Sequence, residues 1–223
     1  MTSKSSLLYP LLGISTILTI WFIITLAKLF HPLLLPSPLE TCSALIELIT
    51  TGVILPDLIL TTKRTILSLI LGITLGVPLG ICAGSFLKIY QSLEFIVEFL
   101  RSIPAPALLP LFLLFFGIGE TTQIALACTV TSLIIFVHTA HGVHHANQGR
   151  ILAGKTLGLS KRALLTKVIF PESLPSISLG IRTALSFSLI VIIVSEMLIG
   201  ASKGLGRKVV DYQLTYNTPE LYA

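Results

Sequence analysis

The sequence predicts an all-α membrane protein, a polytopic bundle of about five helical spans, on three observations. Of the 223 residues, 53% are hydrophobic and only 11% are charged, against about a quarter charged in an ordinary soluble domain. Mean hydropathy is +0.94. The charges are bunched, and the uncharged runs between them are long enough for a hydrocarbon core, which needs about 20 apolar helical residues. Continuous runs also exclude a β-barrel, whose strands alternate in segments of about ten residues.

The first span is expected over about 7–30, because this run is too long for the apolar core of a signal peptide. The segment after it, His31–Pro38, contains three prolines, which cannot continue a helix. Apolar residues at helical spacing beside Glu40 and Glu47 then predict a surface helix over about 38–51.

The second span is expected over about 59–86, with Lys63 and Arg64 near its first end, where long basic side chains extend into the lipid head groups. Its interior carries glycines at four-residue spacing, which puts one bare stripe along a helix. In lipid such a stripe lets a neighbouring helix approach closely. We interpret it as a packing surface rather than as part of a pore; its members are Gly72, Gly76, Gly80 and Gly84.

Residues 88–101 resemble a short polar connection that leads into a third span over about 102–119. Prolines at the start of this span break or kink its helix. Irregular backbone at membrane depth is stable only where protein buries it or where it lines a cavity. Pro104 and Pro106 are therefore candidates for a translocation path, and a purely structural kink is the alternative.

The fourth span is expected over about 123–143. Four histidines lie near the end of this span: His138, His141, His144 and His145. The spacing of 138, 141 and 145 places three imidazoles on one helical face. No carboxylate or cysteine accompanies them, so we expect an interfacial helix end and no metal site. The three cysteines are widely spaced and read as small apolar residues. The chain has no phosphate-binding loop, no HExxH motif and no Gly-x-Ser-x-Gly turn, so no catalytic site or cofactor is expected.

The most polar stretch is the loop 147–172, which carries five basic residues against Glu172 alone. The positive-inside rule places this loop in the cytoplasm. Counting spans backwards puts the N-terminus in the cytoplasm as well. The loop is expected to form a short helix, a turn at Gly158–Ser160, and a second, amphipathic helix that ends at Pro171. Such a rigid helix–turn–helix is suited to docking a soluble partner.

The fifth span is expected over about 174–199 and carries Arg182 and Glu196. The 14 intervening steps correspond to about 21 Å of helix rise, so these two charges cannot pair with each other. Charges in a span normally face the bundle interior or a wet cavity. Both are candidates for the translocation path, with helix anchoring or pairing between subunits as the alternatives. The polar tail 200–223 has no sixth apolar run, so the C-terminus is expected outside.

The loop 147–172 resembles the EAA loop of ABC-importer permeases, which reads Glu-Ala-Ala, three residues, Gly, nine residues, then hydrophobic-x-x-Pro. Ala153 and Gly154 match the small positions, Gly158 matches the glycine, and Pro171 ends the pattern. Leu152 stands where the family has glutamate. The resemblance implies a docking loop for an ATPase, with the residues Ala153, Gly154, Lys155, Gly158, Leu159, Ser160 and Pro171.

The resemblance extends over nearly the whole chain and is closest to the nitrate, aliphatic-sulfonate and taurine branch, through motifs such as Arg101-Ser-Ile-Pro and Ser195-Glu196-Met197. That branch usually has a sixth span, which this chain is expected to lack. The resemblance implies one permease domain over 1–223 with a type I ABC-importer permease fold in the bacterial inner membrane. It implies no enzymatic activity of its own and no binding of nucleic acid.

The partners that the resemblance implies are a cytoplasmic ABC ATPase dimer, a second permease copy and an extracytoplasmic solute-binding protein. The expected cargo is a small oxyanion such as nitrate, a sulfonate or taurine. A permease for a thiamine precursor or another small metabolite is the alternative within this class. A secondary transporter or channel is the alternative from another class, and it would require ionisable residues near the midplane of several spans.

Overall fold

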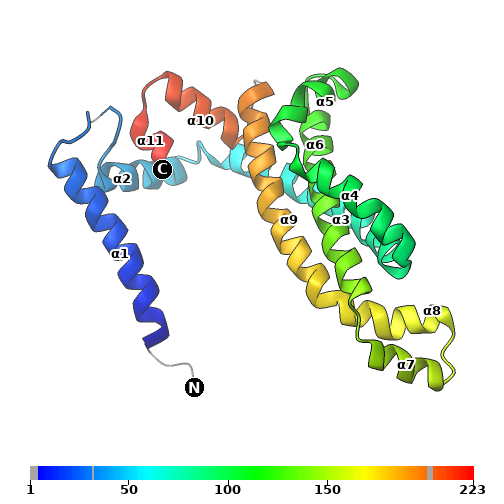
Figure 1. Cartoon of the computed structure of the whole chain (residues 1–223). Helices are drawn as coiled ribbons and strands as arrows, with labels where there is room; N and C mark the ends of the chain where they lie inside the picture. Colours follow the sequence, from blue (N-terminus) through cyan, green and yellow to red (C-terminus); the bar gives the residue numbers. More distant parts are fainter. Residues whose placement is uncertain (1–4, 32, 200–202) are drawn as a thin grey trace. The chain divides into compact units, whose positions relative to one another are not determined.

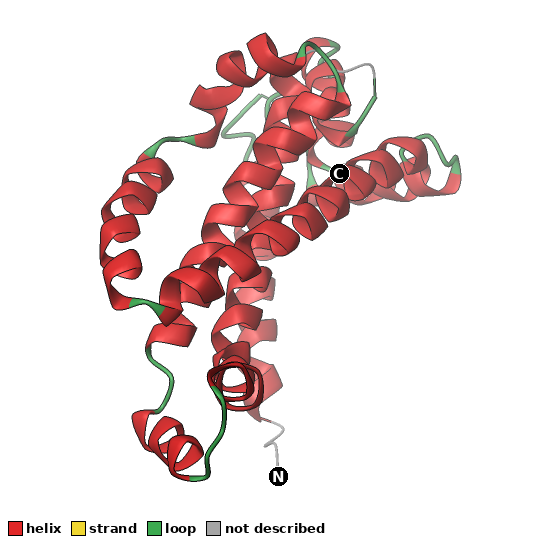
Figure 2. Cartoon of the chain, turned by 90° about the vertical axis from the view of Figure 1, so that its right-hand side faces the viewer, coloured by secondary structure: helices red, strands yellow, loops and turns green. Residues whose placement is uncertain are grey.

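The computed structural model describes residues 5–31, 33–199 and 203–223, and all regular structure in these ranges is helical (Figures 1 and 2). The prediction of an all-α fold is thereby confirmed. The chain forms two compact units. The first unit comprises Met1–Leu58 with Lys203–Ala223, and the second comprises Ile59–Ser202.

The described part of the first unit contains the helices α1 (Ser5–Leu26), α2 (Pro38–Thr50), α10 (Leu205–Leu214) and α11 (Thr218–Tyr222). The helix α2 begins at a capping box, in which the Ser37 side chain accepts a hydrogen bond from the Glu40 N–H and the Glu40 carboxylate accepts one from the Ser37 N–H. Hydrogen bonding from the Ser37 backbone N–H, and then from the Ser37 side chain, to the Glu40 carboxylate holds the pKa of Glu40 below its ordinary value. Helix α11 packs against α2, and the Tyr222 hydroxyl donates to the Leu34 carbonyl at 3.2 Å.

The second unit contains the remaining helices, with α3 starting in the first unit and continuing into the second. They are α3 (Leu55–Ser85), α4 (Leu87–Ser102), the 3-10 helix η1 (Ala105–Leu108), α5 (Leu109–Phe116), α6 (Glu120–His144), α7 (Gln148–Thr156), α8 (Lys161–Leu164), the π-helical turn η2 (Leu165–Ile169) and α9 (Phe170–Ile199). Helices α6 and α9 lie side by side along most of their length (Figure 1).

The core of the second unit lies mainly between α6 and α9. One cluster joins Leu126 and Ala127 of α6 to Val191 and Ile192 of α9, and Leu109 completes it. A second cluster joins Ile134 and Ile135 to Ala184. Small residues on α9, such as Gly180 and Ala184, let the two backbones approach closely, which is the usual basis of helix association in lipid.

The glycine stripe of α3 lies against α6. A Cβ atom at Gly76 would lie 2.7 Å from the Ser132 carbonyl oxygen, and one at Gly80 would lie 2.6 Å from the Thr139 Cβ. Gly72 and Gly84 are equally close to α6. All four positions therefore need glycine because the α6 backbone occupies the space that a side chain would fill.

Among the residues that the structure describes, four helical segments are long and apolar enough to cross a membrane: Tyr9–Leu26, Leu55–Ser85, Glu120–His144 and the continuous stretch Lys161–Ile199. A fifth crossing exists if Lys88–Ser102 and Ala105–Phe116, which are bent by 89° at the break between them, count as one broken span.

The structure differs from the sequence analysis between the second and fourth spans. Residues 88–101, expected as a polar connection, belong to the 16-residue helix α4. Its apolar residues recur at helical spacing, as at Tyr90, Leu93, Val97 and Leu100. The expected third span over 102–119 is instead divided into η1 and the eight-residue α5, which rises only about 12 Å.

Candidate functional site

A cavity of about 400 Å³ lies in the second unit where the broken pair α4–η1 meets α6 and α9. We call it the central cavity. Its apolar wall includes Ile134 and Phe187. Its polar lining residues are Glu98, Arg101, Ser102, Thr129, His138 and Thr183.

The central cavity lies at the middle of the two helices that form its wall. At 1.5 Å per residue, Thr129 and His138 lie about 14 Å and 27 Å from the start of α6, which is itself about 37 Å long. Thr183 and Phe187 lie in the middle third of α9. Because a hydrocarbon core is about 30 Å thick, polar groups at these positions lie at membrane depth.

Pro104 explains why the helix breaks at this cavity. Proline disfavours helical backbone at the preceding residue, and Ile103 has the extended angles φ −77° and ψ 121°. The broken backbone lines the cavity, as irregular backbone at membrane depth must if protein does not bury it. Of the two prolines predicted for the path, Pro104 lies on the cavity wall, whereas Pro106 lies beside Leu126 and Val191 outside it.

The central cavity contains one ion pair. Arg101 Nη1 donates to Glu98 Oε1 at 2.9 Å, and the two side chains are 39% and 61% exposed. Sequence reasoning placed neither residue in a site, because it took 88–101 as a connection. The signal was present in the helical spacing of Glu98 and Arg101, three residues apart and directly before Pro104.

Arg182 and Glu196 do not lie on the wall of this cavity. Arg182 is exposed on α9, and Glu196 is completely buried. The interpretation of Glu196 as a carboxylate that lines an open path therefore does not fit this arrangement. The alternative, helix anchoring, fits it because Glu196 is held by two neighbouring side chains within the same unit.

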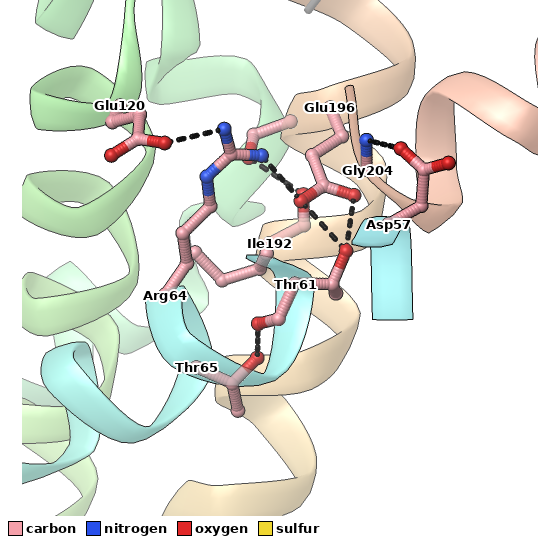
Figure 3. A network of polar contacts seen from close by, with 9 residues as sticks. Asp57, Thr61, Arg64, Thr65, Glu120, Ile192, Glu196 and Gly204 are labelled. Atoms are coloured by element: carbon pink, nitrogen blue, oxygen red, sulfur yellow. Dashed lines mark hydrogen bonds and ion pairs between the residues drawn. The ribbon is translucent and has the colours of Figure 1, made fainter. Parts of the chain in front are cut away.

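Those neighbours are Thr61 and Arg64 of α3 (Figure 3). Arg64 Nη1 donates to Glu196 Oε1 at 2.7 Å, and its Nη2 donates to Glu120 Oε1, at the start of α6, at 2.9 Å. The Thr61 hydroxyl lies 3.0 Å from each Glu196 oxygen. The expectation that Arg64 extends into the head groups is wrong, because its guanidinium bridges two carboxylates and is buried.

The loop 147–172 forms the α7–turn–α8 hairpin at one end of the second unit (Figure 1). Asn147 caps α7 by accepting hydrogen bonds from the Gly149 and Arg150 N–H groups, and Ser160 caps α8 through the Ala163 N–H. Gly158 has φ +76° with open space around it. This backbone angle favours glycine, and the open space leaves the turn accessible to a partner.

A groove of about 400 Å³ lies between α7 and the start of α9. Of the predicted docking residues, Ala153, Gly154, Leu159 and Pro171 line it, whereas Lys155 and Ser160 are exposed outside it. A Cβ atom at Gly154 would lie 2.8 Å from Leu164 Cδ1, so glycine allows α7 to pack on α8. Leu157 lines the groove and is 81% exposed.

The histidines at the end of α6 form ring contacts. His144 stacks on Tyr90 of α4 at 4.8 Å, and the rings of His141 and His145 lie 4.0 Å apart. Within the described ranges, no group of three or more His, Cys, Asp or Glu side chains is placed to hold a metal ion.

Comparison with known proteins assigns the family. Residues 72–223 match the family described as "Binding-protein-dependent transport system inner membrane component". The chain is 31% identical over 198 residues to the taurine transport system permease protein TauC of Escherichia coli (strain K12), covering 86% of this chain and 72% of that protein. It is 30% identical over 209 residues to the putative aliphatic sulfonates transport permease protein SsuC of Bacillus subtilis (strain 168), covering 94% of this chain and 75% of that protein.

The fold is also similar to that of a chain in the crystal structure of an amino acid ABC transporter with histidines. The TM-score is 0.64 at 23% sequence identity, covering 80% of this chain and 86% of that chain. This likeness extends the sequence match to the helical arrangement. The chain therefore belongs to the binding-protein-dependent transport system inner membrane components, the multi-pass permeases of ABC importers.

Proposed function

We propose that this permease imports a small sulfonate, that two copies of it frame the path, and that a cytoplasmic ATPase drives transport through the loop 147–172. An extracytoplasmic binding protein delivers the substrate in this scheme. The names of the relatives, a taurine permease and an aliphatic sulfonate permease, favour sulfonates over a thiamine precursor. The family match favours an ATP-driven importer over a secondary transporter or channel.

The observation that carries this proposal is a continuous helical stretch, Lys161–Ile199, which joins the loop to the cavity wall. Its first turns belong to the α7–turn–α8 hairpin, and its middle carries Thr183 and Phe187 of the central cavity. A rigid helix transmits a displacement along its length, so movement of a docked ATPase would reach the cavity without an intervening joint. The π-helical turn Leu165–Ile169 lies within this stretch, and such turns are frequent at functional sites.

Leu157 is the proposed anchor for the ATPase, because an exposed leucine beside a groove on a polar loop has a large apolar surface to bury in a partner. The test is co-purification in detergent of this chain with candidate ABC ATPases. We expect capture by the wild type and at least about tenfold weaker capture by Leu157→Ser, since burying a leucine contributes about 1.5–3 kcal/mol.

Leu214→Ser is the matched control, because Leu214 is 70% exposed on α10, outside the loop. This variant is expected to capture the ATPase as the wild type does. Equal capture by Leu157→Ser and wild type would contradict docking at this hairpin. Failure of every candidate ATPase to be captured would contradict the ATP-driven scheme.

A further inference from the structure

We infer that the central cavity binds a short zwitterion, with an oxyanion group at Arg101 and an ammonium group at Glu98. This inference rests on the proposed function, and it selects aminosulfonates over simple alkanesulfonates. Arg101 and Glu98 form an ion pair on α4, and both line the central cavity. An exposed pair spaced three residues apart contributes little to the stability of a helix, so helix stability does not account for the two charges on the cavity wall.

The charge balance of the cavity favours a ligand with both charges. An anion that binds the N–H donors of Arg101 comes close to the Glu98 carboxylate, which lies 2.9 Å from the guanidinium. A simple anion would therefore place a second negative charge beside the Glu98 carboxylate. A zwitterion satisfies both groups, because its ammonium group can pair with Glu98 while its oxyanion occupies the guanidinium.

The hydroxyl groups of the cavity point to the same ligand. Ser102, Thr129 and Thr183 each donate a hydrogen bond to a carbonyl of their own helix, at 2.7–2.9 Å. Each oxygen therefore keeps lone pairs with which to accept a hydrogen bond, whereas its proton is already used. A site for a simple anion would offer several free donors. Here Arg101 and the His138 ring supply the donors, and the hydroxyls add acceptors, which an ammonium group needs.

The apolar wall and the size of the cavity restrict the ligand further. Ile134 and Phe187 offer a surface for a short carbon chain between the two charged groups. The cavity volume of about 400 Å³ admits a two-carbon aminosulfonate together with some of its water. The polar lining at mid-helix is the arrangement expected of a substrate site at a broken span.

The test uses the full chain in lipid nanodiscs and saturation-transfer difference NMR, which detects weak binding. Taurine and isethionate are the two probes, because both have a two-carbon sulfonate skeleton. Taurine carries an ammonium group where isethionate carries a hydroxyl group. We expect wild type to bind taurine at least about tenfold more tightly than isethionate, because the hydroxyl group of isethionate offers no positive charge to the Glu98 carboxylate. Equal affinities would overturn the inference, and so would the absence of binding by taurine.

Three variants of the pair sharpen the test. Glu98→Gln is expected to abolish the preference for taurine, and Arg101→Gln is expected to remove binding of both probes. Glu98→Asp is expected to restore part of the preference. An unchanged preference in Glu98→Gln would contradict the role of the carboxylate.

The matched control is Asp211→Asn, which removes the carboxylate of the Arg207–Asp211 pair on α10, where the side chains are 38% and 42% exposed. It is expected to bind both probes as the wild type does. Capture of the ATPase by each variant checks its folding independently. If the wild type captures the ATPase but shows no preference for taurine, the zwitterion site alone is rejected. If the wild type neither captures an ATPase nor binds either probe, the proposed function is rejected too.

Discussion

Arg64 joins three helices of the second unit through its pairs with Glu196 and Glu120. The Arg64 guanidinium donates hydrogen bonds to both carboxylates, and the Thr61 hydroxyl donates to Glu196. These charge-assisted hydrogen bonds offset the cost of burying the charges. The balance depends on every member being present. A buried charge that loses its partner is far more costly than the pair itself is favourable.

At the residue scale we predict that Arg64→Gln destabilises the protein by about 3–5 kcal/mol, because it leaves the buried Glu196 carboxylate uncompensated. Glu196→Gln should be less destabilising, because Arg64 keeps its pair with Glu120. The double variant Arg64→Met/Glu196→Met should be less destabilised than Arg64→Gln. Thermal unfolding of the purified protein in detergent measures the order. Glu120→Gln is the control and should cost only about 1 kcal/mol, since the Glu120 side chain is half exposed. Additive losses in the double variant would contradict a coupled pair.

Residue-level reasoning from the sequence placed a charge in the fifth span but did not find its partner. The spacing along one helix shows only that Arg182 and Glu196 cannot pair. Arg64 lies 132 positions away in the sequence, and the contact depends on how α3 packs beside α9. The antiparallel order of the spans places Arg64 and Glu196 toward the same side of the membrane, which was the available signal.

At the element scale, the glycine stripe of α3 is a packing surface whose members are visible in the sequence. The four-residue spacing identifies one helical face without any knowledge of the partner. That the partner is α6, rather than α9, follows from the tertiary structure. The helix α4 is the opposite case, because its polar residues concealed an amphipathic pattern of 16 residues.

We predict that Gly80→Ala destabilises the protein by about 1–3 kcal/mol, because the new methyl group must displace the α6 backbone. A Cβ at this position would lie 2.8 Å from the Phe136 carbonyl oxygen. Gly13→Ala is the matched control, since it is also a helical glycine and has no atom within 4 Å of the new Cβ. It should be neutral or slightly stabilising. Fluorescence-detected thermal unfolding compares the two, and equal losses would contradict a specific contact between α3 and α6.

At the scale of the whole molecule, the proposed function requires movement to be transmitted from the loop 147–172 to the cavity. Gly158 is the position at which this link can be tested without altering the cavity. Its left-handed backbone angle is strained for residues with a branched side chain, whereas asparagine adopts it more readily.

We predict that Gly158→Val lowers substrate uptake at least about tenfold in proteoliposomes that contain the permease, its ATPase and its binding protein, because a turn strained by about 1–2 kcal/mol fits its partner poorly. The protein should still insert and remain monodisperse. Gly158→Asn should keep more of the uptake, because it preserves the backbone angle while adding a side chain. If Gly158→Asn and Gly158→Val lowered uptake equally, the bulk of the new side chain and not the backbone angle would be the cause.

The sequence by itself determined the fold class, the membrane location, the family and the helix–turn–helix of the loop 147–172. These properties follow from composition, from apolar runs and from local motifs, which are all read over short stretches of chain. The break at Pro104 was also predictable, since proline acts on its immediate neighbour.

Only the tertiary structure decided which charges pair and which residues share a cavity. Arg64 meets Glu196, and Arg101 and Glu98 face Thr129 and Thr183, because helices far apart in the sequence pack at a particular rotation. Periodicity determines the faces of each helix but not which faces meet. That choice depends on close packing between whole helices, to which every small and large side chain along the contact contributes.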